Sequence, residues 1–471
     1  MENYKFSRYN ELIPVPEDNS FLIFNIQKTS LDVIDAQDGL LLSELASVQK
    51  FNYSDIGSKE LMDDFIAKGY IVPEKYEEIN LAEKAYLKSN KGGSAILITI
   101  TTTTICNMDC PYCFEVNKPS VVLKDSTLLK NIKKYIKSMT EKSPPNTYDN
   151  LQLTWYGGEP LINVKSIQDL TPLILEICHD YNLSYKSNII TNGIYLTDEN
   201  VKILTECFVD DFQVTIDGPE HTHNKNRPLK GKNQENYTKI MRHLSALPES
   251  VHISLRINTD REVADGIDEL LDDLEKYKIW PHRVNNMNIE PTPVVAYEGT
   301  QIEANDEKYL DHRDFFDFKQ NFRRKKVERY NRFQSANGGK ISKLSWALPR
   351  AQSDCGTWGE ESGLVIDPRG NIHKCWETVH LKEEAVVKAE DLDKEFSSSP
   401  YEYYTSYNRY NVKTACRMCK FISVCDKITC QKQALESTKP ACTIWKFRTK
   451  DFIKEQYLTY VNTPELIGEP A

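Results

Sequence analysis

Three cysteines stand close together in the segment CNMDCPYC. Cys106 and Cys110 are separated by three residues, and Cys110 and Cys113 by two. Three thiolates at this spacing can bind zinc, but a zinc site is usually completed by a fourth Cys or His nearby, and the segment contains none. They can also hold an iron–sulfur cluster with three protein ligands and one open iron. The spacing favours an iron–sulfur cluster over a zinc site but excludes neither.

A second group of cysteines follows residue 350, and one pair within it has the C-x2-C spacing that zinc ribbons also use. Two further cysteines, Cys178 and Cys207, fall in predicted amphipathic helices with apolar neighbours, which predicts buried structural thiols. The second group consists of Cys355, Cys375, Cys416, Cys419, Cys425, Cys430 and Cys442.

Composition limits the classes of protein to consider. The chain has 69 acidic and 59 basic residues, for a net charge of −10, which argues against a nucleic-acid partner. It contains no apolar run of the about 18 residues that a membrane helix needs, and its first residues do not resemble a secretory signal. We therefore expect a cytoplasmic protein with no membrane partner. In a reducing compartment, its 12 cysteines point to metal or redox chemistry rather than disulfides.

Strand-like and helix-like segments alternate from residue 94 onward. Parallel neighbouring strands need crossover helices, and six strand–helix units are too few for a complete eight-stranded barrel. The pattern predicts an α/β fold, either a partial (β/α)6 TIM-like barrel or an open doubly wound sheet. In both, the site lies at the carboxyl ends of the strands, and the three thiols directly follow the first strand. The predicted strands are 94–105, 151–158, 188–193, 212–217, 251–259 and 284–291.

Composition shifts divide the chain into four parts. Residues 1–85 are predicted to form an α+β unit, with a hairpin near 21–34 and helices at 39–49 and 58–68. A polar linker is predicted at 86–96, ending near two glycines. The α/β core is placed at 97–330, and an irregular, Cys-rich domain at 331–471.

The three-thiol segment is similar to the CxxxCxΦC signature of the radical S-adenosylmethionine (SAM) superfamily, with Tyr112 at the aromatic position. The segments GGEP (157–160), TNG (191–193), TIDGP (215–219) and LRIN (255–258) also resemble that superfamily, in the same order and each on or after a predicted strand. This resemblance implies a [4Fe–4S] cluster on Cys106, Cys110 and Cys113. Its open iron would bind SAM, whose reductive cleavage would give a 5′-deoxyadenosyl radical that abstracts hydrogen from a substrate.

The resemblance also implies which residues contact SAM. Gly157 and Gly158 would allow close approach of the backbone, and Glu159 would receive the amino group. Arg256 would pair with the carboxylate, and Asn192 and Thr215 would serve the ribose or nearby polar atoms. Ile289 is a candidate for an adenine contact, with membership of the barrel core as the alternative. No catalytic acid or base is assigned.

The later cysteines resemble the SPASM extension of radical SAM enzymes, which binds two auxiliary clusters. The inner cluster would use Cys355, Cys375 and Cys430. It would then have one open iron, which could bind a substrate thiolate. One departure from the usual pattern is that four residues rather than three separate Cys425 and Cys430. We therefore expect three [4Fe–4S] clusters, the outer one being bound by Cys416, Cys419, Cys425 and Cys442.

The N-terminal unit resembles the leader-recognition domain of peptide-modifying enzymes, in which a peptide adds a strand to a sheet edge. The alternative is a domain that only covers the barrel. The resemblance implies a maturase of the sactipeptide and ranthipeptide kind, which forms thioether crosslinks in a ribosomally made (RiPP) precursor peptide. Its partners would be that precursor with its leader and an electron donor such as flavodoxin or ferredoxin.

Three other functions are weighed against this one. Carbon–carbon crosslinking of a similar peptide fits the same architecture, and so does anaerobic sulfatase maturation. Against sulfatase maturation, position 376 is Trp, whereas the resemblance to such maturases implies an Asp there. A zinc-stabilised binding module without enzymatic activity would be colourless and would not cleave SAM.

Overall fold

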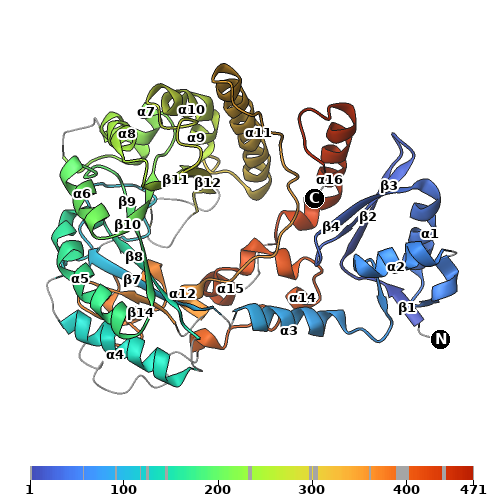
Figure 1. Ribbon diagram of the computed structural model, residues 1–471, viewed down its shortest axis with the longest axis horizontal. Helices are drawn as coiled ribbons and strands as arrows, with labels where there is room; N and C mark the ends of the chain where they lie inside the picture. The colour runs from blue at the N-terminus through green and yellow to red at the C-terminus, as the bar shows by residue number, and fades with distance from the viewer. Residues whose placement is uncertain are drawn as a thin grey trace. The chain divides into compact units, whose positions relative to one another are not determined.

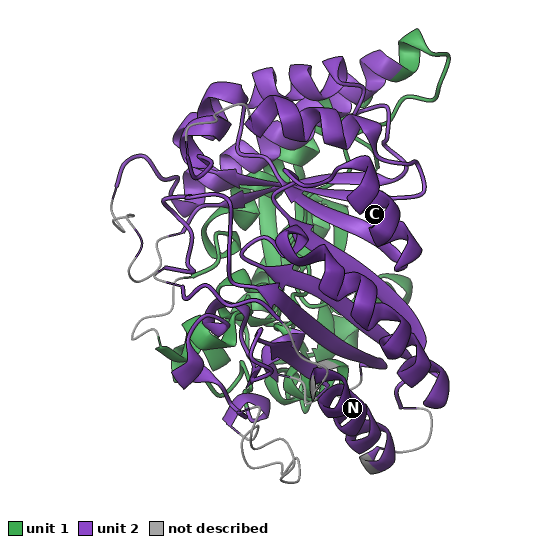
Figure 2. Cartoon of the chain, turned by 90° about the vertical axis from the view of Figure 1, so that its left-hand side faces the viewer, with its two compact units in different colours: residues 1–92, 334–355, 407–471 green, residues 93–333, 356–406 purple. Residues whose placement is uncertain are grey.

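The computed structural model describes most of the chain, and it forms two compact units (Figure 2). Unit 1 comprises residues 1–92, 334–355 and 407–471, and unit 2 comprises 93–333 and 356–406. The described residues are 3–56, 58–90, 93–116, 118–123, 127–143, 147–231, 236–295, 300, 306–359, 362–388, 403–436 and 442–469.

Unit 2 is built on an eight-stranded sheet in the order β12-β11-β10-β9-β8-β7-β13-β14. Neighbours from β12 to β7 all pair in parallel, which confirms the predicted partial barrel. The strands are β7 (Ala95–Thr103), β8 (Asn150–Gly157), β9 (Ser184–Thr191), β10 (Val209–Thr215), β11 (His252–Thr259), β12 (Met287–Pro293), β13 (Gly363–Ile366) and β14 (Ile372–His373).

The sheet also takes in strands that sequence analysis did not predict. β13 comes from the Cys-rich region, and it pairs in parallel with β7, the first strand of the core. β14 then pairs with β13 in antiparallel fashion. Part of the region that we expected to be irregular therefore completes one edge of this sheet.

Helices cover the outer face of the sheet (Figure 1). Helix α10 is typical, because its apolar residues recur at helical spacing and are all buried: Ile267, Leu270, Leu271 and Leu274. The helices are α4 (Thr127–Lys142), α5 (Val164–Asp180), α6 (Asp198–Glu206), α7 (Glu220–Asn226), α8 (Asn236–Ala246), α9 (Arg261–Asp265), α10 (Ile267–Lys276), α11 (His312–Ala336) and α12 (Gly356–Gly359), with short 3-10 turns η2 (Pro160–Asn163), η3 (Trp376–Thr378) and η4 (Lys382–Glu384).

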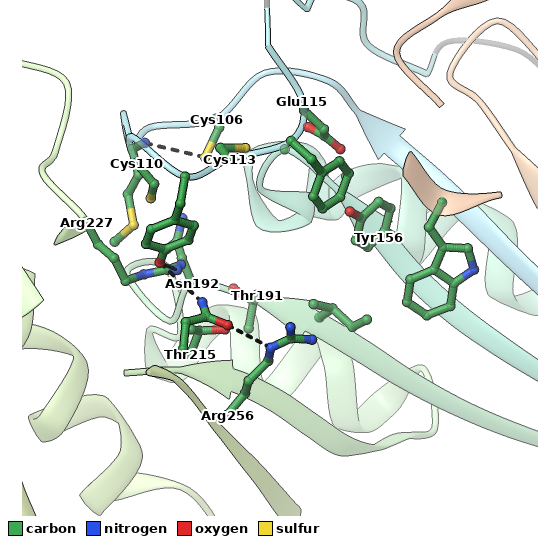
Figure 3. A pocket seen from close by; sticks show the side chains of 18 of the residues that line it. Cys106, Cys110, Cys113, Glu115, Tyr156, Thr191, Asn192, Thr215, Arg227 and Arg256 are labelled. Atoms are coloured by element: carbon green, nitrogen blue, oxygen red, sulfur yellow. Dashed lines mark hydrogen bonds between the residues drawn. The ribbon is translucent and has the colours of Figure 1, made fainter. Parts of the chain in front are cut away.

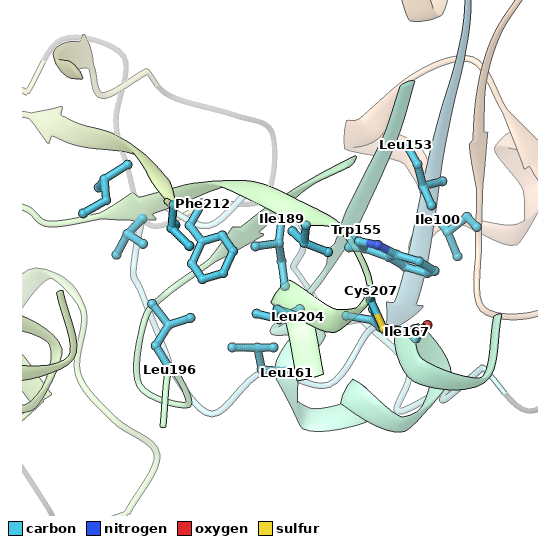
Figure 4. Close-up of a cluster of buried hydrophobic side chains, with 14 of the residues drawn as sticks. Ile100, Leu153, Trp155, Leu161, Ile167, Ile189, Leu196, Leu204, Cys207 and Phe212 are labelled. Carbon is cyan, nitrogen blue, oxygen red and sulfur yellow. Dashed lines mark hydrogen bonds between the residues drawn. The ribbon is translucent and has the colours of Figure 1, made fainter. Parts of the chain in front are cut away.

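The core of unit 2 lies between the strands and this helical layer. Figure 4 shows Trp155 and Phe212 from the strands close to Ile167 and Leu204 from α5 and α6. Cys178 and Cys207 belong to the same core and are buried, as predicted for structural thiols. This packing sets the angle at which the strand ends, and the residues on them, approach one another.

Unit 1 joins the N-terminal segment to the end of the chain. Its first part holds an antiparallel sheet β2-β3-β4 and a second sheet β5-β1-β6. The predicted hairpin near 21–34 corresponds to β3 and β4, and the two predicted helices correspond to α1 and α2. The elements are β1 (Asn3–Phe6), β2 (Asn10–Val15), β3 (Ser20–Asn25), β4 (Ser30–Asp35), α1 (Ala36–Ser47), β5 (Phe51–Asn52), η1 (Tyr53–Ile56), α2 (Lys59–Ala67), β6 (Ile71–Pro73) and α3 (Glu78–Asn90).

The rest of unit 1 consists of short helical turns around the later cysteines and one long helix. The turns are α14 (Thr414–Arg417), η6 (Ile422–Val424), η7 (Asp426–Ile428) and α15 (Gln431–Glu436), and the long helix is α16 (Trp445–Asn462). Helix α3 occupies the first half of the predicted linker at 86–96, of which residues 91 and 92 lie outside the described residues. The domain boundaries at 85, 97 and 331 remain predictions. In the part of the chain that the structure describes, no helix is both long and apolar enough to cross a bilayer.

Candidate functional site

A cavity of about 370 Å³ opens where the parallel strands of unit 2 end (Figure 3). One side of it is formed by the loop after β7, which carries the three thiols. The carboxyl ends of β8, β9, β10, β11 and β12, residues of η3 and Arg227 also line it. Most of the residues that sequence analysis had selected line the cavity: Cys106, Cys110, Tyr112, Cys113, Gly157, Gly158, Asn192, Thr215 and Arg256.

Two glycines let the end of β8 approach the thiol loop. Gly157 has φ +150°, and a Cβ atom there would lie 2.3 Å from the carbonyl oxygen of Thr103. A Cβ atom on Gly158 would lie 2.5 Å from the carbonyl oxygen of Ile105. The Gly158 amide instead donates to the Thr103 oxygen at 2.9 Å. Any side chain at these positions would push the two strand ends apart.

The three thiols share one electrostatic environment. Burial raises the pKa of each thiol, that of Cys110 to about 12. The positive charge of Lys118 opposes this rise most strongly at Cys106 and Cys113, and that of Arg227 opposes it at all three. Thiolates in such a place need a bound cationic centre to remain ionised. Three sulfurs facing a cavity of this size fit an iron–sulfur cluster with room for a ligand beside it. Among the described residues, no three Cys, His, Asp or Glu side chains converge around the position of a single metal ion.

Glu159 connects two strand ends rather than lining the cavity. It is fully buried, and its Oε1 atom accepts hydrogen bonds from the Leu161 amide at 3.0 Å and the Thr191 hydroxyl at 2.7 Å. Its Oε2 atom accepts from the amide of Asn192 at 2.8 Å. Burial raises the pKa of this carboxyl, and these hydrogen bonds oppose the rise. Both oxygens therefore fix the end of β9 to the turn after β8, and contact with SAM remains a prediction.

The other predicted SAM contacts differ in position. Asn192, Thr215 and Arg256 line the cavity, where Arg256 Nε donates to Asn258 Oδ1 at 2.9 Å. Ile289 is 3% exposed within the core of unit 2 and is not among the residues that line the cavity. Its position matches the alternative of a barrel-core residue.

A buried network around Tyr112 was not found from the sequence. The Tyr112 hydroxyl donates to the carboxylate of Asp217 and accepts from Arg227 Nη1 at 2.7 Å and Asn258 Nδ2 at 3.2 Å. Asp217 is fully buried, and burial raises its pKa while Arg227 lowers it. Tyr112 lies in CNMDCPYC, Asp217 in TIDGP, Arg227 just after α7 and Asn258 in LRIN, and the spacing of these segments alone does not show that the side chains meet.

His223 supports this network without being a ligand. Its Nδ1 atom accepts a hydrogen bond from the Asp217 amide at 3.1 Å. Burial and the charge of Arg227 hold the pKa of His223 well below its usual value, so the ring is neutral.

The wall beyond the thiols is aromatic and was also missed. Phe114, Tyr156 and Trp376 line the cavity, and the rings of Tyr156 and Trp376 lie 5.3 Å apart. Glu115 also lines it, with an ion pair of 2.8 Å to Lys118. The cavity therefore has a thiol end and an apolar wall.

The later cysteines are divided between the two units. In unit 1, the backbone of Cys355 is hydrogen-bonded to both neighbours of Cys430. The Cys419 amide donates to the carbonyl oxygen of Cys416 at 3.0 Å. Burial raises the pKa of Cys416, and the charges of Cys419 and Cys442 raise it further. Cys375 lies in unit 2, directly before η3.

Residues 100–274 match the model of the Radical SAM superfamily. This stretch is a radical SAM domain. The match includes the thiol loop and the ends of β8, β9, β10 and β11, the elements that line the cavity. A radical SAM domain implies a [4Fe–4S] cluster and SAM as cofactors, and the three thiols beside a roomy cavity fit both. When bound, they supply an electron and a carbon-centred radical.

Two curated relatives and one solved structure resemble the chain. A serine-type anaerobic sulfatase-maturating enzyme of Bacteroides thetaiotaomicron is 30% identical over 152 residues, which is 30% of this chain and 34% of the relative. The radical SAM cyclopropyl synthase TigE of Paramaledivibacter caminithermalis is 24% identical over 233 residues, 44% of this chain and 48% of the relative. The chain thus spans a third to a half of these relatives.

The solved structure is that of anSMEcpe with bound AdoMet. It superimposes with a TM-score of 0.54 at 16% identity and covers 79% of this chain and 95% of that chain. At this identity the similarity concerns the fold alone, and it agrees with the partial barrel of unit 2.

Proposed function

We propose that this protein is a radical SAM peptide maturase that forms thioether crosslinks from a Cys sulfur to a carbon of an acceptor residue. The observation that carries the proposal is the presence of two thiol sites with different surroundings. One lines the radical SAM cavity. In the other, Cys355 is exposed and hydrogen-bonded next to Cys430.

The cavity fits an acceptor side chain that loses hydrogen. Its aromatic wall, formed by Phe114, Tyr156 and Trp376, excludes water and holds apolar groups opposite the thiol end. Thioether formation removes a hydrogen atom from the acceptor carbon and a proton from the substrate thiol, while a sulfur–carbon bond forms. One electron is left over, and an auxiliary iron–sulfur cluster is the oxidant that we propose for it.

The seven later cysteines would hold two such clusters, as the sequence predicts. The charges of Cys419 and Cys442 act on Cys416, and that of Cys419 acts on Cys425, within unit 1, which supports an outer cluster of these four cysteines. Cys355 and Cys430 support the inner one, with Cys375 as its third cysteine. An inner cluster with three cysteines leaves an iron for the substrate thiolate.

The N-terminal part of unit 1 offers a place for a leader peptide. Strand β4 pairs with β3 and forms one edge of the sheet β2-β3-β4, and Val33 on it is 44% exposed. An extended peptide can add to such an edge through main-chain hydrogen bonds. An electron donor of the flavodoxin or ferredoxin class would reduce the radical SAM cluster.

Sulfatase maturation is the second candidate, and the match to the sulfatase-maturating relative favours it. Against it, the ring of Trp376 packs on Tyr156 in the cavity wall, at the position where an Asp would be expected for that class. Carbon–carbon crosslinking differs from our proposal in leaving the substrate thiols free.

The test is co-expression with a short Cys-containing peptide encoded beside this gene, followed by mass spectrometry. We expect the loss of two hydrogens per crosslink and a matching loss of thiols that can be alkylated. Cys106→Ala should abolish the change, and Cys207→Ala, which alters a core thiol, should not. Lost hydrogens with all thiols still alkylatable would establish carbon–carbon crosslinking instead, and oxidation of a Ser or Cys in an adjacent sulfatase would establish sulfatase maturation.

A further inference from the structure

Arg227 places a buried positive charge beside the thiol loop. It follows the last residue of α7, its side chain is 11% exposed, and it lines the cavity together with Cys110 (Figure 3). Its backbone is fixed on both sides, because its amide donates to the His223 carbonyl at 2.8 Å and its own carbonyl accepts from Asn236 Nδ2 at 2.5 Å. The backbone that carries the guanidinium is therefore held in one place.

The charge of Arg227 is not closely neutralised. Its Nη1 atom lies 4.0 Å from the Asp217 carboxylate, and the hydrogen bond that it makes goes to the Tyr112 hydroxyl, which in turn donates to Asp217. Within the described part of the chain, its buried Nε atom has no hydrogen-bond partner. Two other cations line the cavity. Lys118 is 2.8 Å from Glu115 and shares its charge with that carboxylate, and Arg256 donates to Asn258.

We propose that the positive charge of Arg227 raises the reduction potential of the cluster held by Cys106, Cys110 and Cys113. Three thiolates give such a cluster a net negative charge, which grows when it accepts one electron from a donor of the flavodoxin or ferredoxin class. A buried cation stabilises the more negative, reduced state more than the oxidised one. Asp217 acts in the opposite direction, and Tyr112 holds the two charges apart. This inference rests on the radical SAM domain and not on the proposed peptide chemistry.

The experiment is a potentiometric titration of the anaerobically reconstituted full chain, without peptide, followed by electron paramagnetic resonance. The signal that changes when SAM is added identifies the cluster in the cavity. Arg227→Gln removes the charge but keeps a hydrogen-bond donor, and Arg227→Lys keeps the charge. We expect the midpoint potential to fall in Arg227→Gln and to stay near that of the native protein in Arg227→Lys.

Two further variants separate charge from geometry. Tyr112→Phe breaks the hydrogen bond but leaves both charges, so its midpoint should stay closer to the native value than that of Arg227→Gln. Asp217→Asn removes the opposing charge at constant shape, so its midpoint should rise. This opposite shift also tests the proposal if Arg227→Gln fails to bind iron.

The outcomes that overturn the proposal are distinct. Equal shifts in Arg227→Gln and Arg227→Lys at equal iron content would make the role of Arg227 purely geometric. An unchanged potential in Arg227→Gln, or a fall in Asp217→Asn, would exclude the electrostatic effect. A second readout is the rate of 5′-deoxyadenosine formation, which in Arg227→Gln should fall by a larger factor with flavodoxin as the donor than with dithionite.

Discussion

Cys355 and Cys430 lie on two backbone segments that hydrogen-bond to each other. The amide of Cys355 donates to the carbonyl oxygen of Thr429 at 3.1 Å, and Nε2 of Gln431 donates to the carbonyl oxygen of Cys355 at 3.2 Å. The two residues that flank Cys430 are therefore both hydrogen-bonded to the backbone of Cys355. This arrangement brings together the backbones of two cysteines that are far apart in sequence and that we assign to one auxiliary cluster.

Cys355→Ala should lose the iron and sulfide of one cluster and retain 5′-deoxyadenosine formation, because the cavity thiols are untouched. Peptide crosslinking should be lost. Chemical analysis measures the iron and sulfide content, and chromatography of the SAM products measures 5′-deoxyadenosine formation. Cys178→Ala is the control, since that thiol is buried in the core of unit 2. Equal iron content in the native protein and Cys355→Ala would contradict the assignment.

Gly158→Ala should abolish SAM cleavage and reduce the iron bound at the cavity. The added Cβ atom would lie 2.5 Å from the Ile105 oxygen and 2.6 Å from the Thr104 oxygen, so the thiol loop must move. Gly468→Ala is a matched control, because the nearest atom to its Cβ is 3.8 Å away. Iron analysis and the yield of 5′-deoxyadenosine report the effect, and full activity in Gly158→Ala would show that the loop does not need this close approach.

Asp354→Asn should destabilise unit 1 strongly. Asp354 forms an ion pair with Arg409, and their side chains are 5% and 1% exposed. Breaking a buried pair leaves a buried charge and costs about 3–5 kcal/mol. Glu275→Gln breaks the exposed pair with Arg332 and should cost less than about 1 kcal/mol. Guanidinium unfolding of both variants provides the comparison, and similar losses in the two would show that the Asp354 pair is not desolvated.

Stability should fall below pH 6.5 through His223. The folded protein holds the pKa of His223 well below its usual 6.5, so the unfolded chain binds a proton that the folded one does not. Stability from this group is therefore present above pH 6.5 and decreases as pH falls, by up to about 1.4 kcal/mol per pH unit. His223→Gln should show a flatter profile in urea unfolding between about pH 7.5 and about pH 5.5. The exposed His221→Gln should keep the native slope, and a native slope in His223→Gln would contradict the prediction.

Local spacing was sufficient to predict much of the fold and part of the site. The alternation of strands and helices predicted the parallel sheet of unit 2, because crossover helices force parallel pairing. The thiol loop and the Gly157-Gly158 pair could be placed at the strand ends for the same reason. Both are local signals, since each motif occupies one short segment next to one strand.

The tertiary structure decided which side chains meet across these strand ends. Tyr112, Asp217 and Arg227 come from three separate segments, and only the packing of the strands and helices brings them into one network. Glu159, which sequence analysis assigned to SAM, holds Asn192 through its backbone amide, a partner that no spacing rule indicates. Long-range contacts depend on twist, register and side-chain packing, so they cannot be derived from the period of a single segment.

By itself, the sequence determined the types and local spacing of the chemical groups: a three-thiol loop after a buried strand, two adjoining glycines after the next strand, and a second set of cysteines. Only the tertiary structure decided how β13 joins β7, how Cys355 comes to lie beside Cys430, and where the charge of Arg227 stands. The physical reason is that the electrostatics of a buried site depend on distances between groups from remote segments, and folding alone sets those distances.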